Sequence, residues 1–133
     1  MAKIGSYIVT LNEAHLKWGV HRYTGTRGVV YGEGYIPIPI DKAKALELYN
    51  SNKTGGKDVY GVNLFHCESK DGLFCGVLKS QGCVSEGEPF AKQFSGNNDL
   101  KSVGSWYAAT NAETGDQIKV SITGNDTIEI EKL

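Results

Sequence analysis

The chain has 133 residues, of which 40% are hydrophobic and 22% are charged, so it has the length and composition of one globular domain. No apolar run approaches the roughly 20 residues that a membrane-spanning helix needs, which predicts a soluble protein. The net charge of -1 conceals an asymmetry, because residues 1–57 hold eight Lys or Arg against four Asp or Glu, whereas residues 58–133 hold six against eleven. The amino-terminal half is therefore the better candidate for contacts with an anionic partner.

Two features of the sequence predict a reducing, intracellular environment. The amino terminus has no basic stretch followed by an apolar segment and a small-residue cleavage site, so we expect a cytoplasmic location. The three cysteines, Cys67, Cys75 and Cys83, are an odd number and form no Cys-x-x-Cys pair. This spacing argues against a disulfide framework and a structural zinc site, and we predict neither a metal nor another cofactor.

Extended structure is predicted at the start of the chain. Residues 6–11 alternate between apolar and polar positions and form a strand with Tyr7, Val9 and Leu11 on one face. Residues 29–40 are extended again, but two prolines in this segment cannot donate hydrogen bonds to a ladder. The second segment therefore belongs at a sheet edge or at the end of a strand.

One helix is predicted for the whole chain. Asp41 stands at an N-cap position ahead of residues 42–49, whose Ala, Leu, Lys and Glu favour a helix. Residues 82–105 are too polar and glycine-rich for regular core structure, although Phe90 and Phe94, four residues apart, could share one helical turn.

Two β-hairpins are predicted in the rest of the chain. Residues 59–67 and 73–80 alternate and flank an Asp-Gly turn, and residues 118–122 and 128–130 flank a Gly-Asn turn. Short alternating runs separated by such turns are typical of a β-barrel or a β-sandwich.

The most unusual stretch, residues 17–28, lies between the first two extended segments. It combines basic, hydroxyl-bearing and glycine residues in one polar segment. Arginine can present two donors to guanine or phosphate, hydroxyls can bind phosphate, and glycine lets the backbone approach closely. A solvated loop with incidental arginines is the alternative interpretation. The candidate DNA-binding residues here are His21, Arg22, Tyr23, Thr24, Thr26 and Arg27.

A second polar surface is predicted from residues 79–82 and 90–98. Gln and Asn amides can read the edge of adenine, and lysine can bind phosphate or guanine. Glu86 and Glu88 lie between the two stretches and oppose simple phosphate binding. The candidate DNA-binding residues here are Lys79, Ser80, Gln81, Lys92, Gln93, Asn97 and Asn98.

Two other functions remain open from the residues alone. Asp58, Glu68 and Lys70 have the order of a magnesium-dependent nuclease site, in which two carboxylates hold Mg²⁺ and a lysine polarises the attacking water. Their spacing is loose, and Lys70 falls in the predicted hairpin turn. The third possibility is a barrel that binds a protein or a small ligand, with Trp18 and Trp106 lining its pocket.

Two stretches resemble a known family of DNA-recognition domains. Residues 21–27, followed by residues 32–39 and a short helix, look like the recognition domains of certain type II restriction endonucleases, which resemble EcoRII-type effector domains and the plant B-three domain. Residues 115–120 are similar to the Gly-Asp turn that enters a late strand of such barrels. The resemblance implies one mainly β domain over residues 1–133, an open seven-stranded pseudobarrel with one or two short helices.

The same resemblance implies sequence-specific binding of double-stranded DNA through the major groove. Residues 21–27 match the family's N-arm, and residues 79–81 with 92–98 match its C-arm. Catalysis in that family belongs to a separate nuclease domain, for which this length leaves no space. We therefore expect a non-catalytic recognition module of a restriction endonuclease, whose nuclease domain lies in a longer chain or acts in trans.

Overall fold

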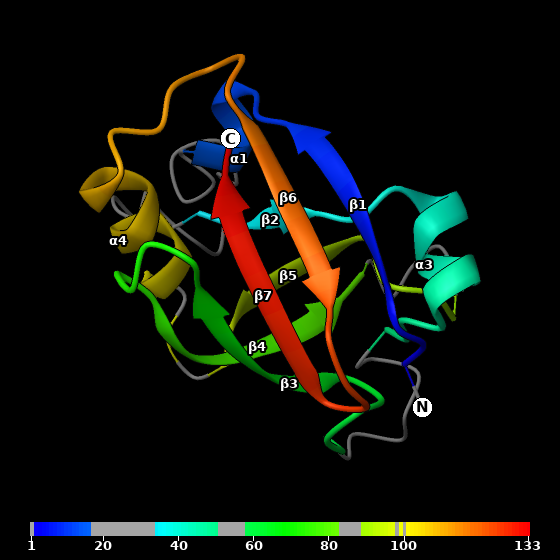
Figure 1. Ribbon diagram of the computed structural model, residues 1–133. Helices are drawn as coiled ribbons and strands as arrows, with labels where there is room; N and C mark the ends of the chain where they lie inside the picture. The colour runs from blue at the N-terminus through cyan, green and yellow to red at the C-terminus, as the bar shows by residue number, and fades with distance from the viewer. Residues whose placement is uncertain (1, 17–33, 51–57, 83–88, 98, 100) are drawn as a thin grey trace, which may run out of the picture.

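Seven strands form one sheet in the computed structural model, which describes residues 2–16, 34–50, 58–82, 89–97, 99 and 101–133 (Figure 1). The strand order is β1-β6-β7-β3-β4-β5-β2, and all neighbouring strands are antiparallel except β3 and β7, which are parallel. The strands are β1 (Gly5–Thr10), β2 (Ile36–Pro37), β3 (Leu64–Ser69), β4 (Cys75–Gln81), β5 (Gln93–Gly96), β6 (Gln117–Ile122) and β7 (Thr127–Lys132). The described helices are α1 (Glu13–Leu16), α3 (Ile40–Leu46) and α4 (Ser102–Ala109).

The sheet curls until its two terminal strands, β1 and β2, meet at a seam. The Tyr7 hydroxyl on β1 donates a hydrogen bond to the Pro37 carbonyl on β2, with an O···O distance of 3.1 Å. A seven-stranded sheet joined in this way is a nearly closed barrel with one seam. The predicted fold class, a mainly β open seven-stranded barrel, is confirmed.

Strand β2 is short and is attached to the rest of the barrel in an unusual way. It forms two ladder pairs with β5, Ile36 with Phe94 and Pro37 with Gln93. On its other edge, the Tyr107 hydroxyl donates to the Tyr35 carbonyl at 2.8 Å, next to the bond from Tyr7. Two buried tyrosine hydroxyls thus bind the carbonyls that a neighbouring strand would otherwise satisfy.

The two longer helices cover the barrel from opposite sides in Figure 1. Helix α4 buries Val103, Trp106 and Tyr107, and α3 buries Ala43 and Leu46. The Trp106 indole also donates to the Asp71 carboxylate in the turn between β3 and β4, with an N···O distance of 3.1 Å. The hydrogen bonds to Ser69, Leu73 and Trp106 lower the pKa of Asp71, and the bond to Ser69 contributes most.

The predicted first strand and both predicted hairpins are present, but the first arm of the first hairpin begins at Leu64, and residues 59–63 form a turn instead of a strand. Tyr7, Val9 and Leu11 are buried, as the alternation of residues 6–11 predicts. Strands β3 and β4 form the first hairpin and β6 and β7 the second. In the first turn Gly72 has a φ of +75°, a backbone conformation that favours glycine. Strand β2 lies at the edge of the sheet order, a position that tolerates the missing N–H of Pro37.

The predicted helix over residues 42–49 is displaced in the structure. Helix α3 begins at Ile40 and ends at Leu46, with Asp41 in its first turn and Pro39 at the N-cap. Glu47 adopts a left-handed conformation and ends the helix. The fully buried Leu48 then continues into an extended segment, where its carbonyl accepts a hydrogen bond from the Ala91 N–H at 2.9 Å. Tertiary pairing therefore overrides the local preference of residues 47–49 for helix.

The prediction that residues 82–105 lack regular core structure was wrong. This stretch contains β5 and the first part of α4, and Phe94 is fully buried on β5. Phe90 forms a bridge with Tyr49 and does not share a helical turn with Phe94. Ser and Gly in α4 weaken its intrinsic preference for helix, so burial of its apolar residues stabilises it instead.

We predict that Tyr7→Phe lowers the free energy of unfolding by about 1–3 kcal/mol, because it leaves the Pro37 carbonyl without its hydrogen bond inside the protein. Urea denaturation followed by circular dichroism measures this change as a lower midpoint at constant slope. Tyr60→Phe is the matched control, because Tyr60 is exposed and its loss of a hydroxyl should cost less than about 0.5 kcal/mol. Equal stability of the two variants would contradict a seam that depends on the Tyr7 hydroxyl.

Candidate nucleic-acid interface

The outer face of strands β4 and β5 carries a group of polar side chains. Lys79 is the register partner of Ser95, and Gln81 is the partner of Gln93. Because side chains alternate along a strand, these four residues share one face, whereas Leu78 and Phe94 point into the core. We call the four residues the polar floor.

Hydrogen bonding orients the amide at one end of the polar floor. The Ser95 hydroxyl donates to Gln81 Oε1, with an O···O distance of 3.0 Å. Ser95 is only 4% exposed, whereas Gln81 and Gln93 are half-buried and reach the surface. A buried hydroxyl therefore positions an accessible amide.

A lysine at the other end of the polar floor is already paired. Lys79 Nζ lies 3.1 Å from the Asp58 carboxylate, and the two side chains are 21% and 34% exposed. An ion pair that is partly exposed contributes on the order of 0–1 kcal/mol, so a phosphate could compete with Asp58 for the lysine. Lys79 is thus a weaker phosphate ligand than an unpaired lysine would be.

The remaining predicted C-arm residues occupy different environments. Ser80 is fully buried, and its hydroxyl donates to the Tyr49 carbonyl at 2.7 Å. Ser80 therefore contributes to the stability of the fold and does not reach the surface. Lys92 and Asn97 are half-buried beside the polar floor. The Lys92 N–H donates to the Gln81 carbonyl at 2.7 Å, which ties the returning chain to β4. Asn98 lies outside the described residues.

The predicted N-arm residues, 21–27, also lie outside the described residues, but the structure describes both ends of their segment. The Tyr35 N–H donates to the His15 carbonyl at 3.1 Å, and the two rings meet edge to face. Gly34 approaches α4 so closely that an added Cβ would lie 3.1 Å from the Gly104 Cα atom. The chain therefore departs at Leu16 and returns at Gly34 beside the same hydrogen bond.

A reciprocal capping arrangement holds the departing end at α1. The Asn12 side chain accepts a hydrogen bond from the His15 N–H at 3.1 Å, and His15 Nδ1 accepts one from the Asn12 N–H at 3.0 Å. This is a capping box with histidine in the place usually taken by Glu or Gln. His15 Nδ1 can accept only when the ring is neutral, and burial lowers the pKa of His15 in the same direction.

One buried asparagine joins the ends of the segment between β4 and β5. The Gly82 N–H donates to Asn50 Oδ1 at 3.0 Å, and the Asn50 N–H donates to the Pro89 carbonyl at 2.8 Å. The Asn50 side chain itself is fully buried. The described residues on either side of 83–88 are thereby held at one point.

These two attachment points lie at opposite ends of the same short pair of strands. Tyr35, at the first point, precedes the ladder pair of Ile36 with Phe94. At the other end the Ile38 N–H donates to the Lys92 carbonyl at 2.8 Å. The polar floor runs along β4 and β5 between the two attachment points, although its four residues come from two separate stretches of sequence.

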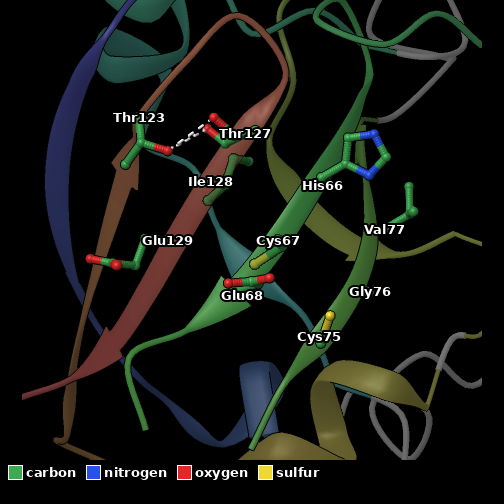
Figure 2. Close-up of a pocket in the computed structure, with 10 residues that line it drawn as sticks. All are labelled: His66, Cys67, Glu68, Cys75, Gly76, Val77, Thr123, Thr127, Ile128 and Glu129. Carbon is green, nitrogen blue, oxygen red and sulfur yellow. Dashed lines mark hydrogen bonds between the residues drawn. The ribbon is translucent and has the colours of Figure 1, made fainter. Parts of the chain in front are cut away.

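The end of β4 far from Gln81 has a different character. There Cys75 is the register partner of Glu68 on β3. Glu68 is in turn the register partner of Glu129 on β7, so the two acidic residues lie on one face of the sheet. Both residues line a surface hollow of about 640 Å³ together with His66 and Cys75. Figure 2 shows these side chains. Repulsion by these carboxylates disfavours contact between this part of the surface and a polyanion.

The residues of the predicted nuclease site are not brought together. Asp58 pairs with Lys79, and Lys70 pairs with Glu131 at 3.8 Å on another part of the sheet. Within the described ranges, no three His, Cys, Asp or Glu side chains are grouped so that they could hold a metal ion. Trp106 is buried in the core, and Trp18 lies outside the described residues, so the structure does not show the pocket predicted between them.

We predict that His15 makes the stability of the domain depend on pH. Burial lowers the pKa of His15 in the folded protein, so as the pH falls the unfolded chain, with the ordinary value of 6.5, takes up the proton first. The stabilisation from neutral His15 is complete above pH 6.5 and is lost as the pH falls through the lower folded-state pKa. His15→Gln keeps an acceptor in the capping box but does not titrate. Urea denaturation from pH 8 to pH 5 should show wild type losing stability relative to this variant, and parallel curves would contradict the role of His15.

Comparison with known proteins identified no relative of this chain. No family model, curated protein or solved structure matches the chain. Among the helices that the structure describes, none is long and apolar enough to cross a membrane.

Proposed function

We propose that this domain binds double-stranded DNA sequence-specifically through the major groove, as the non-catalytic recognition module of a restriction endonuclease. The nuclease domain would belong to a longer chain or act in trans. Such a module would work on DNA in the cytoplasm. The nearly closed seven-stranded barrel is consistent with the family resemblance of residues 21–27 and 32–39. The position of the polar floor and the distribution of charge also support the proposal.

The observation that carries the proposal is the placement of the polar floor between two attachment points. One point holds both ends of the segment that contains Arg22 and Arg27, and the other holds both ends of the segment 83–88. Between them, Gln81 and Gln93 offer amides of the kind that read base edges. The amides proposed to read bases therefore lie between the described ends of the two segments.

The distribution of charge supports the same orientation. Glu68 and Glu129 would repel phosphates, and Glu68 is opposite Cys75, at the far end of β4 from Gln81. A duplex would therefore approach the end of β4 and β5 that carries Gln81 and Gln93. In this arrangement Lys79 and Lys92 bind phosphates, and Asn97 and Asn98 supplement the amides of the polar floor. The proposed N-arm contacts come from His21, Arg22, Tyr23, Thr24, Thr26 and Arg27.

We predict that Arg22→Ala or Arg27→Ala weakens binding to a duplex selected from a random pool, without unfolding the domain. An arginine that binds a base edge in two places should cost about 1–3 kcal/mol and relax selection at one base pair, whereas a phosphate contact should weaken all sequences alike. Fluorescence anisotropy at fixed salt measures the affinities. Lys44→Ala, on the exposed face of α3, is the control that should leave binding unchanged. Unchanged affinity in both arginine variants would contradict the N-arm assignment.

We also predict a moderate salt dependence. The proposal assigns about four phosphate contacts, to Arg22, Arg27, Lys79 and Lys92. A plot of the logarithm of the affinity against the logarithm of the salt concentration should then have a slope of about -3.6, since each contact contributes roughly -0.9. The selected duplex should keep measurable affinity at salt concentrations where random DNA has lost it. A steep slope without discrimination between sequences would contradict specific recognition.

A cleavage assay tests the alternative nuclease function. If the protein cleaves plasmid in the presence of Mg²⁺, and Asp58→Ala or Glu68→Ala abolishes this cleavage, the result would favour the nuclease function.

A further inference from the structure

Two glutamine side chains of the polar floor lie directly opposite each other. Gln81 and Gln93 form the last ladder pair of β4 and β5 before the chain leaves the sheet at Gly82. Side chains that are directly opposite in an antiparallel pair have Cβ atoms about 4.5–5.5 Å apart. Two amides therefore stand next to each other at one end of the outer face of β4 and β5. Amide side chains of this kind can read base edges in the major groove.

The hydrogen bond from Ser95 leaves the Gln81 amide able to read a base. An amide oxygen has two acceptor positions, of which the Ser95 hydroxyl occupies one. The second acceptor position and the amide N–H₂ remain for a ligand. An amide with a free acceptor and a free donor side by side matches adenine, whose N6 amino group donates and whose N7 accepts.

We propose that Gln81 selects adenine in the bound duplex, that Gln93 reads the neighbouring base pair, and that Ser95 is the positioning residue for Gln81. This inference rests on the proposed function and names the base that the polar floor recognises. Ser95 is almost fully buried, so its effect on DNA must pass through the amide that it holds.

The experiment begins with selection of duplexes from a random pool by wild-type protein at fixed salt. Affinities are then measured for the selected duplex and for duplexes with each base pair replaced. Replacing the adenine read by Gln81 should weaken wild-type binding about 5- to 140-fold, which corresponds to about 1–3 kcal/mol at 1.4 kcal/mol per tenfold. Gln81→Ala should remove most of this discrimination, and Ser95→Ala should reduce it.

Two further variants separate base reading from general damage. Gln81→Glu keeps the acceptor for Ser95 but replaces the amide donor with a second acceptor, so preference should shift from adenine toward cytosine, whose amino group donates. Gln117→Ala removes an exposed glutamine on β6, away from β4 and β5, and should leave both affinity and preference unchanged. Thermal unfolding of each variant shows whether the fold is intact. If Gln81→Ala does not fold, the preference of Gln81→Glu decides the outcome.

The outcomes distinguish this inference from the function on which it rests. If wild type selects a sequence and the Gln81 variants show the same base preferences, the assignment of Gln81 is overturned while DNA recognition stands. If wild type enriches no sequence and shifts no duplex, DNA recognition fails and the base assignment fails with it. Loss of discrimination at one adenine in Gln81→Ala, but not in Gln117→Ala, supports the assignment.

Discussion

Closure of the barrel depends on two tyrosine hydroxyls that replace a missing strand partner. Strand β2 is the last strand of the order and forms only two ladder pairs with β5, so the carbonyls of Tyr35 and Pro37 have no neighbouring strand to bind them. Tyr107 on α4 and Tyr7 on β1 donate to these two carbonyls. Burial raises the pKa of both tyrosines well above the ordinary value, which keeps the hydroxyls protonated as donors.

The seam also determines where the candidate interface lies. Because β2 is held between β5 and the two tyrosines, the chain that returns at Gly34 enters the barrel beside β5. The same strand β5 presents Gln93 and Ser95 on its outer face. The position of β2 therefore determines where Gly34, the first described residue after the segment that contains Arg22 and Arg27, lies relative to the polar floor. Glu68 on β3 and Glu129 on β7 lie toward the opposite end of β4 from Gln81, so the acidic residues and the polar floor are separated along the strand.

Local patterns in the sequence predict the parts of the fold that form between neighbours in the chain. Both hairpins follow from alternation and from turn residues, because each strand pairs with the next one. Helix α4 escaped prediction because Ser and Gly lower its helix preference, although the spacing of Val103, Trp106 and Tyr107 matches one face of a helix. Alternation along β4 would likewise have placed Ser80 inside, opposite in direction to Lys79 and Gln81.

By itself, the sequence determined the mainly β class, the edge position of β2 and the residue types suited to reading DNA. The tertiary structure alone decided which of those residues lie together. Tyr7 and Pro37 are 30 residues apart in the chain, Tyr35 and Tyr107 are 72 apart, and Gln81 and Ser95 are 14 apart. Contacts over such separations leave no local periodicity, because they arise when the whole sheet curls and its strands take their register.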